Sequence, residues 1–159
     1  MNSSKGFSLL EALIVIAVIA ILATVAVPSM VSQRHSAILK DTVSMIRGDL
    51  EVARSWAIRE NAFVPVIFSN NSYTVFIDNG SGGGVANNWV RDGDERILCN
   101  RNLPAGTQID LSQTTFIAHR TRFNGKGYST TIGILTLLNT NGKSATIDMN
   151  NRFGRIKTN

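Results

Sequence analysis

The first third of the chain changes from a continuous apolar run to a spaced apolar stripe. Residues 12–27 carry no charge, and Thr24 has their only polar side chain, so the run approaches the roughly 20 residues that cross a bilayer. After Pro28, apolar residues recur every three or four positions, as on one face of a helix: Leu39, Val43, Ile46, Leu50, Ala53 and Ala57. The pattern predicts one long helix over about 7–61, kinked by Pro28.

From residue 63 onward the apolar period changes to two, which predicts strands. Residues 63–68 and 73–77 form a predicted hairpin around Asn70-Asn71. Pro65 favours an edge strand or the start of a strand. Further strands are predicted at 108–111, 114–118, 132–138 and 145–149, with a short final strand at 153–157.

Turn signals separate these strands. The glycines of residues 79–88 predict a flexible loop, and Asp92-Gly93-Asp94-Glu95 predicts a turn. Asn124-Gly125 and Asn141-Gly142 predict tight turns, the second a hairpin. The fold class is therefore α+β: a long N-terminal hydrophobic spine helix packed on an antiparallel β-sheet head.

Glu11 interrupts the apolar N-terminal segment with a charge. A carboxylate there costs on the order of 2.5–3.5 kcal/mol on insertion, so it needs a partner or a purpose. A cleaved secretory signal would have a shorter apolar run and a small-residue cleavage site, which Pro28-Ser29-Met30 does not match. A plain anchor fits the run but leaves Glu11 unexplained, unless its side chain only reaches back to the lipid headgroups.

The string Lys5-Gly6-Phe7-Ser8-Leu9-Leu10-Glu11 resembles the class III signal of type IV prepilins and type II secretion pseudopilins. The resemblance implies that a prepilin peptidase cuts after Gly6 and that Phe7 is then N-methylated. It also implies that Glu11 pairs with the Phe7 amine of a neighbouring subunit during assembly, and Pro28 matches the family's helix kink. A buried charge pair of this kind offsets two separate desolvation costs.

On this resemblance the chain divides into four parts. Residues 1–6 are a leader, 7–30 the transmembrane half of the helix, 31–62 its amphipathic half and 63–159 the β-rich soluble head. The implied location is the bacterial inner membrane, with a single span and a periplasmic head, and then a pilus or pseudopilus filament. The implied partners are other pilin-like subunits, the peptidase and the membrane; the choice between pilus and secretion system stays open.

A second resemblance concerns the head. The tract Trp89-Val90-Arg91-Asp92-Gly93-Asp94-Glu95-Arg96-Ile97-Leu98 and the later Phe123-Asn124-Gly125-Lys126-Gly127 and Gly154-Arg155 are similar to the GspH/FimT pseudopilin family. That family implies a minor subunit rather than the main fibre protein. An anchored ligand-binding domain unrelated to pili is the further alternative.

Charge is distributed unevenly along the 159 residues. The chain has a net charge of +5, but residues 96–159 carry nine Lys and Arg against two Asp and Glu. DNA-binding members of the GspH/FimT family carry Gly-Arg-x-Arg near the C-terminus; here Gly154-Arg155-Ile156-Lys157 replaces the second arginine by lysine, which keeps the charge but loses the bidentate fork. The alternative function is therefore double-stranded DNA binding during uptake, by a predicted cluster of Lys143, Arg152, Arg155 and Lys157.

Enzyme chemistry finds little support in the sequence. His35 and His119 lie 84 positions apart and are predicted to be surface residues. Cys99, the lone cysteine, can form no intramolecular disulfide and has no local histidine partner. The spacing of residues 92–95 misses the calcium-loop pattern, so a turn is favoured over a metal site. We expect no catalytic residue, metal or cofactor.

Overall fold

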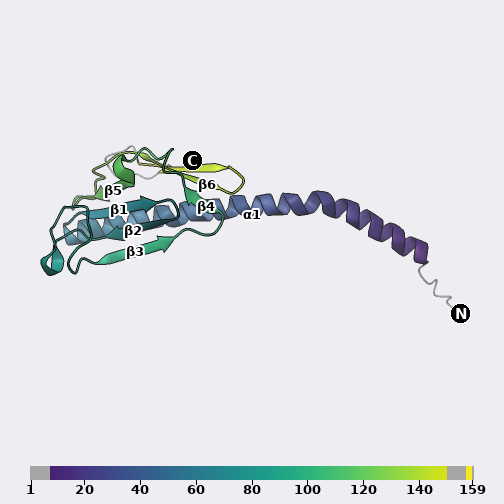
Figure 1. Ribbon diagram of the computed structural model, residues 1–159, viewed down its shortest axis with the longest axis horizontal. Helices are drawn as coiled ribbons and strands as arrows, with labels where there is room; N and C mark the ends of the chain where they lie inside the picture. Colours follow the sequence, from purple (N-terminus) through teal and green to yellow (C-terminus); the bar gives the residue numbers. More distant parts are fainter. Residues whose placement is uncertain (1–7, 150–156, 159) are drawn as a thin grey trace. The chain divides into compact units, whose positions relative to one another are not determined.

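A computed structural model describes residues 8–149 and 157–158. The chain divides after Arg34 into two compact units. Helix α1 (Leu9–Glu60) spans 52 residues and confirms the predicted spine helix (Figure 1). It continues without interruption through Pro28, and the kink there stays a prediction.

Both ends of α1 are capped by residues that the sequence supplies. At the start, the Oγ of Ser8 accepts a hydrogen bond from the backbone N–H of Glu11 at 3.2 Å. At the end, Asn61 takes a left-handed conformation with φ 48°, and the N–H of Ala62 donates to the carbonyl of Ala57 at 3.2 Å. This pair of features is a Schellman-type termination, which turns the chain toward the first strand.

Residues 35–149 form the head together with β8. One antiparallel sheet has the strand order β3 (Ile97–Asn102), β2 (Ser72–Phe76), β1 (Val64–Ser69) and β5 (Arg120–Phe123). The other has the order β4 (Thr107–Ile109), β6 (Ile134–Asn139), β7 (Ser144–Asp148) and β8 (Lys157–Thr158). The predicted hairpins at Asn70-Asn71 and Asn141-Gly142 are both formed.

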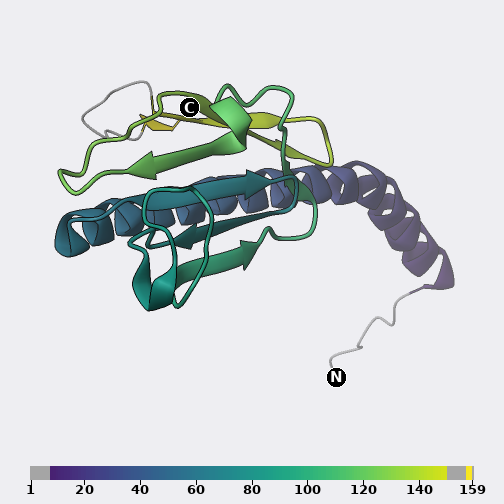
Figure 2. The same cartoon turned by 60° about the vertical axis from the view of Figure 1, so that its left-hand side comes forward.

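The core of the head lies between these sheets and the second half of α1 (Figure 2). All six residues of the predicted stripe are at most 6% exposed: Leu39, Val43, Ile46, Leu50, Ala53 and Ala57. They pack with alternate residues of the strands, such as Val66 opposite Val75 and Leu135 opposite Ile147. Burial of this stripe therefore supplies the head with its main hydrophobic contact.

One predicted strand is wrong. Residues 114–118 follow a turn at 111–113 and run without a strand into the short 3₁₀ helix η2 (Ile117–His119), and the strand is β5, immediately afterwards. The carboxylate of Asp110 accepts the N–H of Ser112 at 3.0 Å, and the Asp110 carbonyl accepts the Thr114 hydroxyl at 2.7 Å. These local bonds hold a turn, although Thr114 and Phe116 are buried in alternation as in a strand.

Pro65 does not lie on an edge strand. Strand β1 pairs with β2 on one side and β5 on the other. Pro65 is its second residue, and pairing with β2 begins only at Val66. Pro65 has no N–H group to donate, and it lies before the first hydrogen-bonded pair of β1 and β2. Its position therefore agrees with the second alternative given by the sequence, the start of a strand.

Candidate functional site

The first half of α1 exposes apolar side chains on every side. Ten large hydrophobic residues between positions 9 and 22 are each 48% to 81% exposed: Leu9, Leu10, Leu13, Ile14, Val15, Ile16, Val18, Ile19, Ile21 and Leu22. This helix is long and apolar enough to cross a membrane. Such a surface needs lipid or another apolar helix to cover it.

Glu11 lies in the first turn of α1 and is exposed. With Ser8 it forms the spacing Ser-x-x-Glu, in which the serine caps the helix and the glutamate occupies the third helical position. A carboxylate is also favourable near the positive end of the helix dipole. Glu11 therefore has a local structural role beside the assembly role that the resemblance implies. Gly6 and Phe7 lie outside the described residues.

A polar cluster joins the second half of α1 to the first sheet of the head. The carboxylate of Asp49 accepts hydrogen bonds from the hydroxyl of Tyr73 at 2.5 Å and from the Nε of Arg101 at 2.5 Å. The Sγ of Cys99 lies 3.7 Å from the same carboxylate oxygen. Burial, with the Asp49 charge, raises the pKa of Cys99 to about 11 and that of Tyr73 well above its usual value. The cluster stabilises the head and leaves the thiol protonated and unreactive near neutral pH.

The carboxylates near the acidic turn organise the loop that follows β2. Asp78 and Glu95 are each 1% exposed. The Glu95 carboxylate accepts N–H groups from Gly80 at 2.8 Å and Asp92 at 3.2 Å, and the Glu95 N–H donates to the Asp92 carbonyl at 3.2 Å. The predicted turn is therefore confirmed. Among the described residues, no group of three or more His, Cys, Asp or Glu side chains is placed to hold a metal ion.

Lys143 is separated from Lys157, the one other residue of the predicted basic cluster that the structure describes. Strand β8 pairs with β7 so that Lys157 lies opposite Asp148, five positions from Lys143 along the chain. At about 3.4 Å per residue, this places the two lysine backbones at least roughly 13 Å apart. The predicted cluster across the hairpin therefore does not bring Lys143 to Lys157. Arg152 and Arg155 lie outside the described residues.

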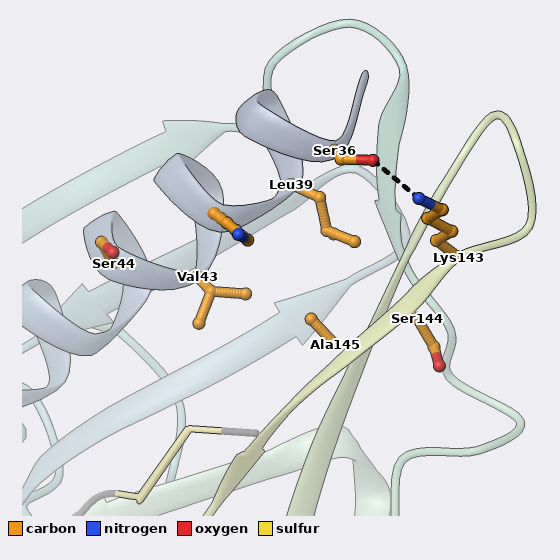
Figure 3. A pocket seen from close by; sticks show the side chains of 8 residues that line it. Ser36, Leu39, Val43, Ser44, Lys143, Ser144 and Ala145 are labelled. Atoms are coloured by element: carbon orange, nitrogen blue, oxygen red, sulfur yellow. Dashed lines mark hydrogen bonds between the residues drawn. The ribbon is translucent and has the colours of Figure 1, made fainter. Parts of the chain in front are cut away.

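The side chain of Lys143 points to α1. Its Nζ donates a hydrogen bond to the Oγ of Ser36 at 3.2 Å (Figure 3). The two residues border a groove of about 540 Å³ between α1 and the start of β7, with Leu39, Val43 and Ala145 in its lining. This hydrogen bond holds the Lys143 ammonium at the groove, away from the paired end of β8.

The two histidines are half-buried rather than fully exposed. The Nδ1 of His35 and the Oγ1 of Thr140 are hydrogen-bonded at 2.5 Å. The Nδ1 of His119 is buried without a partner among the described residues. His119 and Ala118 both have positive φ, 51° and 53°, because η2 turns sharply into β5. His35 lies in α1 and His119 in η2, so the two histidines do not form a common site.

Both tryptophans contact two arginines, an arrangement that sequence reasoning missed. The guanidinium carbons of Arg120 and Arg122 lie 4.6 Å and 4.2 Å from the centre of the Trp89 ring system. The guanidinium carbons of Arg59 and Arg96 each lie 4.6 Å from the centre of the Trp56 ring system. The one available signal was the spacing Arg120-x-Arg122, which puts both side chains on one face of a strand.

Comparison with protein families agrees with the two parts of this chain. The model of the prokaryotic N-terminal methylation motif matches residues 1–27, and the model described as type II transport protein GspH matches residues 42–152. Searches of curated proteins and of solved structures return no match. Because the second family model covers most of the chain, this protein belongs to the GspH family of type II transport proteins, the pseudopilins.

Proposed function

We propose that this chain is a minor subunit of a pilus or of a type II secretion pseudopilus, which it enters through α1. The observation that carries the proposal is the difference between the two halves of one helix. The stripe from Leu39 to Ala57 is buried in the chain's own head, whereas the apolar residues from Leu9 to Leu22 are exposed on all sides. The exposed half is suited first to lipid and then to the helices of other subunits.

The proposed route to the filament begins in the inner membrane, with the head on the periplasmic side. A prepilin peptidase cuts after Gly6, and the amine of Phe7 is methylated. The match of residues 1–27 to the methylation motif supports this route. The role is structural rather than catalytic, which agrees with the high pKa of the Cys99 thiol.

Glu11 is proposed to pair with the Phe7 amine of a neighbouring subunit. Its support is the cost of an unpaired carboxylate in an apolar segment, on the order of 2.5–3.5 kcal/mol. The capping contact with Ser8 offers a competing explanation, because a third-position glutamate also stabilises a helix start in its own chain. The two explanations differ in whether position 11 must be charged. Glutamine can take the place of Glu11 in the helix cap, but it cannot form an ion pair with the Phe7 amine.

Three variants of the full chain test this proposal in cells that make the other subunits. Glu11→Gln keeps the capping spacing and removes the charge, Glu11→Leu removes both, and Ser8→Ala removes the cap and keeps the charge. We expect all three to insert into the membrane, and only the two Glu11 variants to be depleted from sheared filaments. Normal incorporation of Glu11→Gln would show that Glu11 acts as a cap alone.

DNA capture by the head is the second candidate function. The excess of basic residues after position 95 supports it, because clustered positive charge favours binding to polyanions. The separation of Lys143 from Lys157 limits the proposed site to Arg152, Arg155 and Lys157.

A further inference from the structure

Trp89 is held against β5 by an unusual loop conformation. Both Trp89 and Asn87 have positive φ, 66° and 69°, which L-residues other than glycine rarely adopt. The buried carboxylate of Asp78 accepts the N–H of Trp89 at 3.0 Å and also that of Asn87. Backbone strain of this kind persists only where the surrounding structure holds it, and it is found most often at functional positions. The loop therefore maintains a costly geometry that places one indole ring on two arginines.

The two arginines of β5 share one face of the strand, which lies beside β1 (Figure 1). Thr121 and Phe123 point to the core and are fully buried, whereas Arg120 and Arg122 are half-exposed. Contacts between cations and aromatic rings occur about once per 70–80 residues, so a chain of this length should contain about two. Of the five such contacts in the described part of the chain, three lie together, since Arg122 is also 4.0 Å from the Phe63 ring centre.

The positive charge of this cluster is not matched by a bound carboxylate. The Nη1 of Arg122 donates a hydrogen bond to the carbonyl of Asn87 at 3.4 Å, and the Nε of Arg122 is buried without a partner among the described residues. Within the described part of the chain, the guanidinium of Arg120 has the Trp89 ring as its contact and no carboxylate bound to it. Burial lowers the pKa of Arg122, as does repulsion from Arg120, and the charge of Asp78 opposes both effects. The two carboxylate oxygens of Asp78 instead accept N–H groups from Asn87 and Trp89.

This chemistry fits an anionic side chain of another protein. Contact with the indole holds both guanidinium groups beside it, and the Asn87 carbonyl takes only one N–H group of Arg122. Arg120, which is half-exposed, keeps the two-donor edge that suits two-point binding of a carboxylate. Tryptophan and arginine are also the residues most enriched where protein interfaces derive their affinity. Val90, next to Trp89, is 56% exposed and adds an apolar contact.

We propose that Trp89, Arg120 and Arg122 form a docking surface for a carboxylate-bearing segment of a neighbouring filament subunit. This inference rests on the proposed assembly function and adds a second contact, through the head, to the helix contact. The surface recognises an Asp or Glu side chain that lies beside an aliphatic residue. Two arginines are too few for tight binding of a nucleic acid, whose affinity grows with the number of phosphates contacted.

Photocrosslinking in cells that make all the motif-bearing subunits tests the inference. A crosslinking amino acid is placed at Val90 in the full-length chain, and a second version carries it at Ile16 in the apolar helix. We expect position 90 to crosslink to another subunit that carries the N-terminal methylation motif, within a segment that contains Asp or Glu. Arg120→Glu should lower that yield by roughly tenfold or more, because its carboxylate neutralises Arg122 within the chain.

The controls separate this inference from the proposed assembly function. Lys126→Glu makes the same charge change at another exposed position of the head and should leave both crosslinks unchanged. Arg120→Gln, which adds no charge, should also weaken the crosslink at 90. Changing the partner's carboxylate to arginine should restore crosslinking to Arg120→Glu.

The crosslinking results distinguish failure of the docking surface from failure of the assembly function. Crosslinks at position 90 to nucleic acid or to proteins without the motif, or a yield that Arg120→Glu and Arg120→Gln leave unchanged, overturn the docking surface. If crosslinks at position 16 persist in that case, helix-mediated assembly still stands. If position 16 also crosslinks to no motif-bearing subunit, the assembly function itself is wrong.

Discussion

The hydroxyl of Tyr73 donates a hydrogen bond to the carboxylate of Asp49 at 2.5 Å, which joins strand β2 to helix α1 inside the head. Tyr73 is 1% exposed, and the same carboxylate accepts a hydrogen bond from Arg101. Because the lone Cys99 can form no disulfide within the chain, this contact is one that fixes the position of the helix against the sheet at a defined point. Polar contacts of this kind add specificity to an otherwise apolar interface.

Removing this carboxylate should destabilise the head. Asp49→Ala leaves the buried Tyr73 hydroxyl without an acceptor, so we expect the free energy of unfolding to fall by about 1–3 kcal/mol. The measurement is denaturant unfolding of the full chain in detergent micelles, followed by near-ultraviolet circular dichroism. Asp41→Ala, an exposed carboxylate on the same helix, is the matched control. Equal stability of the two variants would show that the contact with Tyr73 contributes nothing.

Cys99 should react slowly with alkylating agents at neutral pH. Burial, with the charge of Asp49, raises its pKa from 9.0 to about 11, and only the thiolate reacts. We expect the alkylation rate of the full chain to rise with pH toward a midpoint near 11, provided that the head stays folded. Because folding raises this pKa, its contribution to stability is complete below pH 9 and is lost as the pH rises through 11. Urea-unfolded protein is the reference; a folded midpoint near 9 would contradict the described environment.

Processing should depend on the glycine at position 6. We expect the mature chain to begin at Phe7, because glycine has no Cβ to crowd the bond that is cut. Gly6→Val should leave an uncut precursor in the membrane, detected by its larger mass and an intact Met1. Ser4→Val makes a similar change two residues earlier and should leave cleavage unaffected. Recovery of intact Met1 from the wild-type chain, in cells with an active prepilin peptidase, would rule out this processing.

The sequence predicted those parts of the fold that depend on local periodicity. Leu39 to Ala57 have helical spacing and become the buried stripe, and Asn141-Gly142 becomes a hairpin turn. The strand expected at 114–118 fails because Asp110 and Thr114 bond locally, a competition that apolar alternation does not reveal. Such errors arise where side-chain hydrogen bonds decide the backbone.

The parts of the candidate sites that depend on contacts between residues far apart in the sequence could not be predicted from it. The approach of Trp89 to Arg120 depends on a loop with left-handed residues and on a buried Asp78, neither of which has a periodic signal. The predicted meeting of Lys143 with Lys157 assumed that the final strand reaches the turn between β6 and β7. The register instead puts Lys157 at the opposite end of β7. Strand register over a gap of this length is decided by tertiary packing.

The register of β7 and β8 determines which lysines and arginines the DNA-binding alternative predicts to be important. Lys143 is bonded to Ser36 and lies apart from Lys157, so Lys143→Ala should leave DNA affinity and its salt dependence unchanged. Arg155→Ala combined with Lys157→Ala removes two cations from the tail itself. Each phosphate contact contributes about 0.9 to the slope of log K against log salt, so the double variant should lower that slope by about two.

Full-length chain in uncharged detergent micelles, titrated with duplex DNA at several salt concentrations, measures this slope. Binding by so few cations should be weak and independent of sequence, because contacts to phosphates carry no base information. Arg120→Gln is the matched control, since it removes a cation of the head that lies outside the tail. A slope that the double variant leaves unchanged, or no binding at low salt, would eliminate the tail as a DNA site. The tail would then be ordinary solvated surface, and the assembly role would stand without DNA capture.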